Sequence, residues 1–370
     1  MAAGHDKGQD KAGMAGQSGQ HVTARSRLEM LRRIAHRLGL DSSGGIVLAT
    51  ILLFLLSALV KPESLGSGAL SGMLPFAAVL AFVALGQTLV IQQGGIDLSV
   101  PGVVSLSAVI VTYSAIGGQG SLGAGLILPI LYAYAASLLA GLVNGLLVSR
   151  VHVAPIVATI GMNAVLYGVN VSISGGTPVN MPDGLLYFVN LRFLGITSLI
   201  FVAIAVTFIV TFLVKKTVFG RRFEAVGANP RAARAAGVDT GSYQLAAYAG
   251  ASLLYCTAGI LLGALMQLPS AFQGDVYLMP SIAAAVLGGT SLFGGRGNLV
   301  ASVVAALFLT QLQQLVLTTG SSVGVQYLFQ GAAIIVGVGV YSIRFESLRK
   351  AIRRLFQIQH GQGESSVSQS

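Results

Sequence analysis

The sequence contains no tryptophan and only one cysteine, and charged residues make up just 9% of its 370 residues. Soluble domains carry roughly 25% charged residues, which cover the surface with groups that water solvates. A chain with 54% hydrophobic residues cannot hide all of its apolar side chains from water, whereas a lipid bilayer accepts them on the protein surface. The composition therefore predicts an integral membrane protein.

The scarce residue types also exclude several classes of function. Cys256 has no partner for an intrachain disulfide, and its apolar surroundings suit a small packing residue. Four of the five histidines lie in or beside tails and loops, and His152 lies near a helix start, so we expect no metal site. There is no HExxH motif, no Walker A loop and no Ser-His-Asp pattern. We expect neither enzyme activity nor a cofactor bound by this chain.

Hydrophobic runs separated by polar or glycine-rich segments predict an all-α polytopic membrane protein with about ten transmembrane helices. Each run approaches the roughly 20 residues that a helix needs to span a bilayer. The predicted helices cover residues 46–60, 70–92, 100–116, 122–149, 153–173, 194–214, 243–267, 277–293, 298–317 and 324–342.

Basic residues are concentrated in three polar stretches. Of the 22 lysines and arginines, 7 fall in residues 1–45, 6 in 215–241 and 5 in 344–370. The positive-inside rule places such stretches in the cytoplasm. Ten helices with a cytoplasmic N-terminus satisfy the rule for all three stretches and leave only Lys61 and Arg192 outside. An odd number of helices would place the basic C-terminal tail on the wrong side.

This topology predicts three regions. A cytoplasmic tail over residues 1–45, partly disordered, precedes a transmembrane domain over 46–342, and a second cytoplasmic tail covers 343–370. Two groups of four helices, around 70–173 and 243–342, run in opposite directions, which allows an inverted repeat of the kind found in transporters.

The cytoplasmic loop 215–241 is predicted to contain a short helix. Asn229 followed by Pro230 is a typical helix start, Ala232–Ala236 favours a helix, and Gly237 ends it. A helix of about two turns does not persist alone in water, so a protein surface is expected to pack against it.

Glycines interrupt three of the apolar segments, one of them at Gly175–Gly176, where an outer loop begins. Gly94–Gly102 contains Asp97, the only acidic residue within the predicted hydrophobic spans. Glycine pairs at Gly288–Gly289 and Gly294–Gly295 bracket a second short polar segment. Helix breaks at membrane depth occur where they pack within protein or line a cavity.

Taken together, three segments resemble the signature motifs of ribose-type permeases of ATP-binding-cassette (ABC) transporters, a family that also includes branched-chain amino acid permeases. The similar segments are Leu85–Val100, Phe219–Val238 and Ile282–Gly297. Two positions depart from the family pattern. Pro101 stands where glycine is usual, and Val276–Ser281 replaces a Tyr-Glu-Leu-Asp segment that many relatives carry, so acidic groups there cannot be carried over.

The resemblance implies a permease subunit of an importer in the bacterial inner membrane, for a sugar or a sugar-like neutral solute. Cytoplasmic ABC ATPase subunits would bind ATP and Mg²⁺, an extracytoplasmic solute-binding protein would deliver the solute, and a second permease subunit, identical or different, would complete the pore. The residues that match the family's ATPase-docking pattern are Gly220, Arg221, Gly227, Asn229, Ala232, Ala233, Arg234 and Gly237.

Polar and glycine positions within the spans are candidates for a solute pathway or gate, because uncharged amides and hydroxyls suit a neutral polyol. The main candidates are Gln87, Thr88, Gly94, Gly95, Asp97, Ser99, Asn144, Asn163, Gly288, Gly289 and Thr290. Further candidates for the lining are Gln92, Asn170, Gln267 and Gln311. Each of these side chains is equally suited to hydrogen bonds between helices.

Asp97 keeps an alternative function open. A carboxylate within the membrane is a functional hypothesis by default, and an ion-coupled secondary transporter for a small polar solute would use one. Its place before Leu98 and Ser99 also suits capping of the following helix, or a role in a gate. A proton-coupled transporter usually needs several charges in a relay, which the sequence lacks. A passive channel or scaffold would leave the short helix of the 215–241 loop unexplained.

Overall fold

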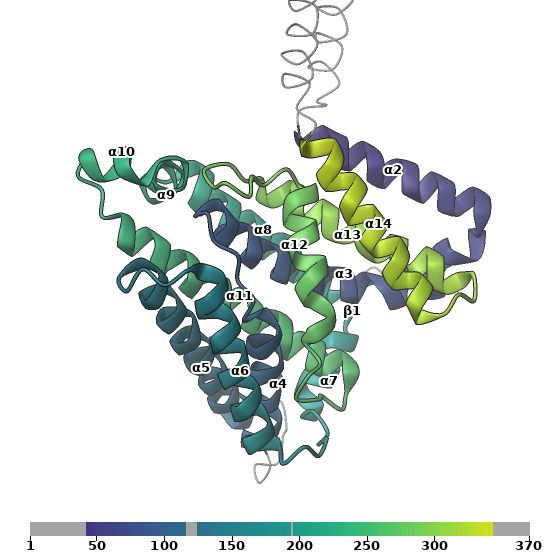
Figure 1. Ribbon diagram of the computed structural model, residues 1–370. Helices are drawn as coiled ribbons and strands as arrows, with labels where there is room; N and C mark the ends of the chain where they lie inside the picture. The colour runs from purple at the N-terminus through teal and green to yellow at the C-terminus, as the bar shows by residue number, and fades with distance from the viewer. Residues whose placement is uncertain (1–41, 116–123, 194, 343–370) are drawn as a thin grey trace, which may run out of the picture. The chain divides into compact units, whose positions relative to one another are not determined.

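The computed structural model describes residues 42–115, 124–193 and 195–342 (Figure 1). The chain separates into two units, Met1–Gly45 and Ile46–Ser370, and nearly all the described residues belong to the second. The two predicted tails lie outside the described residues, apart from the first residues of helix α2.

Helices occupy all ten segments in which the hydropathy predicts them. They are α2 (Ser42–Val60), α3 (Ser67–Gln92), α4 (Val100–Ser114), α5 (Ala124–Ser149), α6 (Pro155–Ser174), α8 (Ser198–Lys216), α11 (Thr240–Met266), α12 (Leu278–Leu287), α13 (Leu299–Thr318) and α14 (Val323–Ser342). In the described part of the chain, six are long and apolar enough to cross a membrane, namely α3, α5, α6, α8, α11 and α13. The protein is therefore an all-α polytopic membrane protein.

One predicted boundary is wrong. The eighth helix was expected to reach residue 293, but α12 ends at Leu287. The chain turns there because Gly288 and Gly289 follow, and Gly289 takes a φ of +86°, a conformation that side chains disfavour.

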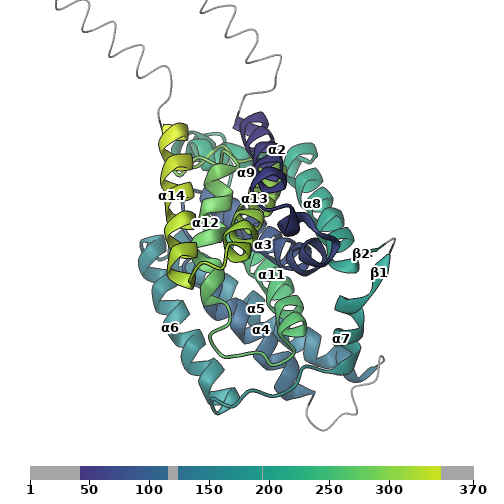
Figure 2. The same cartoon turned by 90° about the vertical axis from the view of Figure 1, so that its right-hand side faces the viewer.

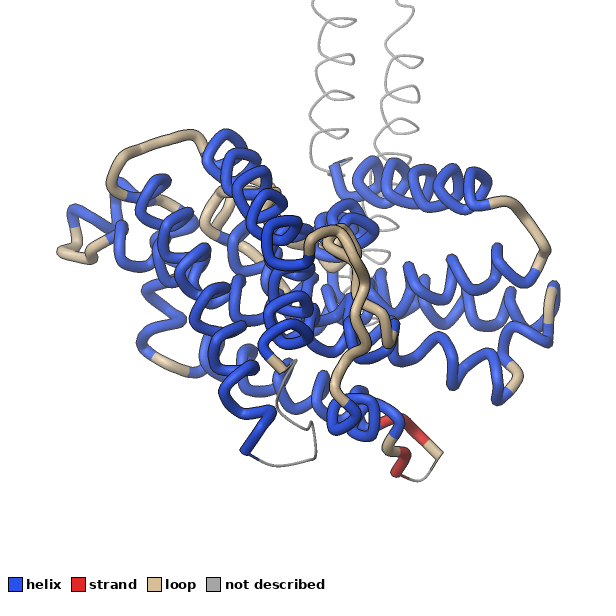
Figure 3. The backbone as a smooth tube through the Cα atoms, turned by 90° about the horizontal axis from the view of Figure 1, so that it is seen from below, coloured by secondary structure: helices blue, strands red, loops and turns tan. Residues whose placement is uncertain are grey.

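Short elements connect the long helices. They are η1 (Pro62–Leu65), α7 (Asp183–Asn190), β1 (Arg192–Phe193), β2 (Ile196–Thr197), α9 (Val218–Ala228), α10 (Pro230–Ala235) and η2 (Asp275–Tyr277). The two strands form a small antiparallel hairpin in which Arg192 pairs with Thr197, and Figure 3 shows the strands in red.

Helix α3 forms the centre of the bundle. Within its apolar window 89% of the residues are buried, against 67% for α11 and 56% for α13. It packs against α11, α13 and α12, while α11 also packs against α4 and α5, as Figure 2 shows from a second side. The core of the protein is therefore a set of apolar helices around α3 and α11.

Helices α5, α6 and α8 lie at the periphery of this core. Only 33%, 22% and 22% of their apolar windows are buried. Their outward side chains are large and apolar, for example Phe208 at 70% exposed and Val157 at 64% exposed. In water such continuous apolar faces would promote association, whereas lipid is their natural surroundings. These faces are typical of helices in contact with a bilayer.

Glycines allow α11 to approach its neighbours closely. A Cβ atom at Gly259 would lie 2.1 Å from the carbonyl oxygen of Val104 on α4. One at Gly141 on α5 would lie 2.7 Å from the carbonyl oxygen of Tyr248 on α11. Small residues at such crossings let helix backbones come together, which is how helices gain packing energy inside a membrane.

We expect Gly259→Val to destabilise the purified protein by about 2 kcal/mol, because the new side chain meets backbone atoms that cannot move aside. Thermal unfolding in detergent measures the effect. Gly161→Val on α6 is the matched control, since a Cβ there meets nothing within 4 Å. Equal loss of stability in the two variants would contradict the close-packing role of Gly259.

Candidate functional site

The loop between α8 and α11 folds into two consecutive helices. Thr217 begins α9, and its Oγ1 accepts a hydrogen bond from the Gly220 backbone N–H at 3.1 Å. Asn229 begins α10, and its Oδ1 accepts one from the Ala232 N–H at 3.0 Å. Side-chain acceptors at these positions satisfy N–H groups that a helix start leaves free. The predicted short helix is confirmed as α10, and α9 was not predicted.

The matched loop residues take different positions. Ala233 is 6% exposed, whereas Arg221 and Arg234 are exposed. A Cβ at Gly220 would lie 1.9 Å from the carbonyl oxygen of Val214, so glycine lets α9 fold back onto the end of α8. Gly237 takes a φ of +79° and turns the chain from α10 toward α11. The docking roles of these residues stay predictions.

Segments from all three sequence motifs meet at the end of α3. The carbonyl oxygen of Gln92 accepts a hydrogen bond from the Gly295 N–H at 2.9 Å, and the Gln93 side-chain Nε2 donates to the Phe223 carbonyl at 2.8 Å. A Cβ at Gly227 would lie 2.0 Å from the same Gln92 oxygen. We call Gln92, Gln93, Phe223, Gly227 and Gly295 the three-way junction.

The 288–298 loop between α12 and α13 completes this junction. Gly294 and Gly295 take φ values of +85° and +76°, and a Cβ at Gly295 would lie 2.5 Å from the Ala228 Cα. The loop is closed by a hydrogen bond from the Ser291 N–H to the Arg296 carbonyl at 2.9 Å. Its Phe293 side chain is 97% exposed. Backbone-to-backbone contact fixes the loop against α9 and leaves an aromatic ring on the surface.

The glycine-rich break follows directly from the junction. Gly94 has a φ of +78°, and a Cβ at Gly95 would lie 2.4 Å from the Tyr248 hydroxyl. Asp97 is 1% exposed, and its Oδ1 accepts hydrogen bonds from the Ser99 N–H at 2.9 Å and the Ser99 hydroxyl at 2.6 Å. Ser99, which begins α4, also accepts a hydrogen bond from Asn144 of α5 at 2.9 Å. Asp97 thus holds Ser99, the N-cap residue of α4, in place from two positions earlier in the chain.

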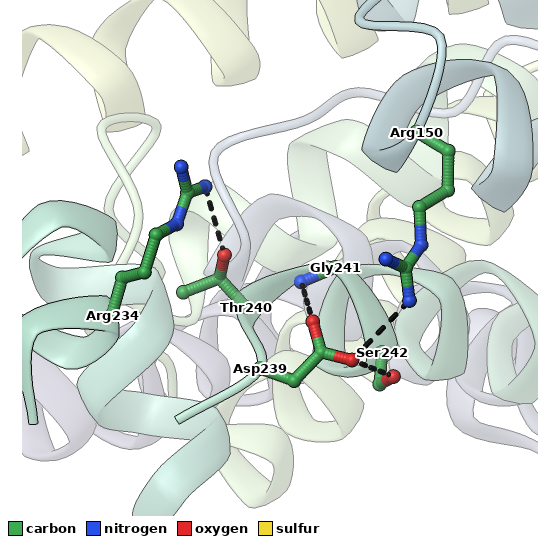
Figure 4. Close-up of polar contacts among 6 residues, drawn as sticks. All are labelled: Arg150, Arg234, Asp239, Thr240, Gly241 and Ser242. Atoms are coloured by element: carbon green, nitrogen blue, oxygen red, sulfur yellow. Dashed lines mark hydrogen bonds and ion pairs between the residues drawn. The ribbon is translucent and has the colours of Figure 1, made fainter. Parts of the chain in front are cut away.

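A second polar cluster links α10, α11 and α5 (Figure 4). Arg150 follows α5 and pairs with Asp239 at 3.2 Å, while Arg234 of α10 donates to the Thr240 hydroxyl at 3.1 Å. Asp239 and Thr240 are the N-cap and the first residue of α11. The cluster therefore ties the exposed loop to two long helices.

Asp239 also caps the helix that it precedes. Its Oδ1 accepts a hydrogen bond from the Gly241 N–H at 3.1 Å, and its Oδ2 accepts one from the Ser242 hydroxyl at 2.5 Å. The Ser242 hydrogen bond, together with the charge of Arg150, lowers the pKa of the Asp239 carboxyl below its ordinary value. The carboxylate is therefore ionised at neutral pH and holds its partners as a full charge.

The predicted pathway residues are mostly used between helices. Tyr255 donates to Gln87 at 3.0 Å, and Thr88 donates to the Ser302 hydroxyl at 2.9 Å. The oxygen of Asn163 accepts from the Gly102 N–H at 2.8 Å. Three further candidates lie around the turn after α12: Gly288, where a Cβ would lie 2.5 Å from the Ser302 backbone nitrogen, Gly289 with a φ of +86°, and the buried Thr290.

A cavity of about 480 Å³ lies elsewhere in the bundle. It is formed by the first half of α3, the end of α11, the 273–280 segment and the adjoining parts of α13 and α14. None of the predicted pathway candidates lines it, and five glutamines do: Gln273, Gln313, Gln314, Gln326 and Gln330. Sequence reasoning missed them. In the sequence, only the four-residue spacing of Gln326 and Gln330 points to such a lining, because it puts both side chains on one face of a helix.

Comparisons with known proteins agree with the motifs. The family model described as "branched-chain amino acid transport system / permease component" matches residues 69–338. The galactofuranose transporter permease protein YtfT of Escherichia coli (strain K12) is 35% identical over 324 residues, covering 83% of this chain and 92% of the relative. The ribose import permease protein RbsC of Bacillus subtilis (strain 168) is 30% identical over 314 residues, covering 84% and 96%.

A third relative is the autoinducer 2 import system permease protein LsrC of Escherichia coli (strain K12 / DH10B), 32% identical over 269 residues, which cover 72% of this chain and 77% of the relative. No solved structure matches the chain significantly. The region that the family model matches includes all the segments that meet at the three-way junction. The predicted resemblance is confirmed, and this multi-pass membrane protein belongs to the family of ABC transporter permeases described as branched-chain amino acid transport system permease components.

Proposed function

We propose that this chain is the membrane-spanning subunit of an ATP-driven importer, which carries a neutral sugar or sugar-like solute across the bacterial inner membrane. The observation that carries the proposal is the three-way junction, because it joins the exposed α9–α10 loop to the most buried helix of the bundle. The relatives are named for galactofuranose, ribose and autoinducer 2 import, which supports the solute class.

The proposed topology has ten membrane crossings and both termini in the cytoplasm. It leaves 20 of the 22 basic residues on the cytoplasmic side. The basic helices α9 and α10 lie toward the opposite end of the bundle from α7, in agreement with this orientation (Figure 1). The inverted repeat of the two four-helix groups stays a prediction.

The energy source in this proposal is a separate cytoplasmic ATPase, on which ATP and Mg²⁺ bind. Its docking surface would be α10 with the exposed Phe293 beside it. Because the Gly294 and Gly295 backbones lie against Gly227 and Ala228, the Phe293 loop and the α9–α10 loop would move as one body. A rigid ring held at the surface suits a protein contact, since an aromatic side chain gives a large buried area at little cost in entropy.

Movement of α9 would reach the membrane interior by a short route. Gln92 and Gln93 bond to the 288–298 loop and to α9, and they precede the Gly94–Ser99 break without any intervening residue. Glycine-rich breaks absorb backbone rotation, so displacement of α9 would change the angle between α3 and α4. A second route for this displacement starts at α10. It passes through Thr240 and Asp239 to the start of α11 and to the end of α5.

The remaining partners follow from the same proposal. A second permease subunit would complete the pore, and an extracytoplasmic solute-binding protein would deliver the solute to the end of the bundle opposite α9 and α10.

The ion-coupled alternative rests on Asp97. Both hydrogen bonds recorded for its carboxylate come from Ser99, which favours a role in ordering the start of α4.

The proposal is tested in proteoliposomes that contain the permease with its candidate ATPase and solute-binding protein. We expect solute uptake and solute-stimulated ATP hydrolysis, both abolished when the ATPase is omitted. Uptake that needs no ATPase and follows a pH gradient alone would replace the importer with the secondary transporter.

Gly227→Val should uncouple hydrolysis from transport, because a side chain at this position meets the Gln92 carbonyl at the three-way junction. We expect uptake to fall roughly tenfold or more while the complex still assembles and hydrolyses ATP. Ala225→Val is the matched control, since Ala225 lies on the same helix with an exposed side chain. Uptake by Gly227→Val at the rate of the control would remove the junction from the coupling route.

Arg234→Ala should lower coupled uptake roughly two- to fivefold, because it removes the hydrogen bond between α10 and the first residue of α11. Arg231→Ala removes the same charge from the same helix and leaves the Thr240 contact in place. The ratio of solute transported to ATP hydrolysed is the measurement. If both variants change this ratio equally, surface charge rather than the Thr240 contact matters.

A further inference from the structure

The glutamine-lined cavity lies in the half of the bundle farthest from the three-way junction. Its wall on α3 runs from Gly72 to Leu80, at least 12 residues before Gln92, which corresponds to about 18 Å along the helix axis. Its walls on α11 and α13 are likewise at the ends opposite Thr240 and Leu299. If ATPase docking occurs at α9 and α10, this cavity lies on the side from which solute arrives.

The cavity wall combines many amides with few other polar groups. Its described lining includes no Asp, Glu, Lys, Arg or His, and its polar members other than a tyrosine pair are Gln273, Gln313, Gln314, Gln326, Gln330 and Thr310. Aromatic side chains complete the wall at Phe76, Tyr277, Tyr327 and Phe329. The volume of about 480 Å³ is within the range of small-molecule sites.

Among the glutamines of the cavity wall, Gln273 has the clearest need for a ligand. Both of its polar side-chain atoms, Nε2 and Oε1, are buried, and neither has a hydrogen-bond partner among the described residues. A buried amide without partners is costly, and native proteins rarely keep one without a purpose. A molecule that both donates and accepts hydrogen bonds would satisfy both atoms.

The lining selects among classes of solute. A carboxylate or an ammonium group would lose its hydration and find no opposite charge among these side chains. A purely apolar solute would leave the buried Gln273 amide unpaired. Hydroxyl groups, in contrast, both donate and accept hydrogen bonds, as amides do. The C–H faces of a sugar ring can also pack against the aromatic side chains of the wall.

We propose that this cavity is a receiving site for a neutral polyhydroxylated solute of monosaccharide size, with Gln273 as its central hydrogen-bonding group. The inference rests on the proposed importer function and adds to it the place of the site and the residues that select the solute. Five uncharged amides on three separate segments provide contacts that helix movements can break one after another, so the solute can be released.

Initial uptake rates in the complete reconstituted transporter test this site. The probes are radiolabelled D-ribose, D-galactose, D-xylose and myo-inositol as neutral polyols, with L-leucine and D-glucosamine as charged comparators. For the neutral polyol that the transporter carries, we expect Gln273→Leu to lower the uptake rate about tenfold and Gln330→Leu severalfold. Each variant lowers the rate because it removes buried hydrogen bonds to the solute. Gln244→Leu is the control, because Gln244 lies in the first turns of α11, away from the cavity.

A direct binding measurement uses the lack of tryptophan in the chain. Tyr327→Trp places a sole tryptophan on the cavity wall of the full-length permease. We expect its fluorescence to change with the same neutral polyol in the purified permease, and the change to disappear when Gln273→Leu is added. Size-exclusion chromatography and assembly with the ATPase check that the Gln273→Leu variant is folded.

The outcomes distinguish a failure of the cavity proposal from a failure of the proposed importer function. ATP-driven uptake of a neutral polyol that Gln273→Leu leaves unchanged would overturn the cavity as the receiving site and keep the importer. ATP-driven uptake of only the charged comparators would overturn the solute class. Absence of any ATP-dependent uptake or solute-stimulated hydrolysis, with all partners present, would overturn the importer function itself.

Discussion

The carbonyl oxygen of Gln92 is the contact on which the rest of the structure depends. It ends the most buried helix of the bundle, accepts the Gly295 N–H, and lies directly against the α9 backbone at Gly227. No side chain separates these three backbones, so the contact has almost no freedom to slide or to be filled by solvent. A close-packed contact of this kind transmits displacement instead of absorbing it.

Helix α3 then carries any displacement across the bundle. The helix has 26 residues and is roughly 39 Å long, and 89% of its apolar window is buried. One end of α3 belongs to the three-way junction, and its first half forms a wall of the glutamine-lined cavity. The two sites are therefore opposite ends of the same packed helices, which gives a physical basis for coupling between them without a continuous polar path.

The sequence allowed the positions of the long helices to be predicted, because apolar length and positive charge directly reflect the bilayer. Asn229 and Pro230 also correctly predicted α10. Helix α9 was missed, since Gly220 and Gly227 each cost about 1 kcal/mol in helix propensity relative to alanine. In the folded chain these glycines permit contacts with the Val214 and Gln92 carbonyls that no alanine would fit.

The site could be predicted only where its residues are close in sequence. The glutamines of the cavity come from segments around residues 273, 313 and 326, and nothing in a linear sequence shows that they face one another. Gln87 and Thr88 stay candidates for the solute pathway. Their side chains bond to Tyr255 and Ser302 and so join helices, which is a common use of polar groups where water is absent.

Asp97 links these findings through the contacts of its buried carboxylate. It orders Ser99, and Ser99 in turn accepts from Asn144 of α5. Six residues farther along, Arg150 pairs with Asp239 at the start of α11. Since six residues of helix rise only about 9 Å, the end of α5 is joined both to the glycine-rich break and to the cluster beside α10. The carboxylate thus belongs to a second mechanical connection between the loop and the break, parallel to the one through Gln92.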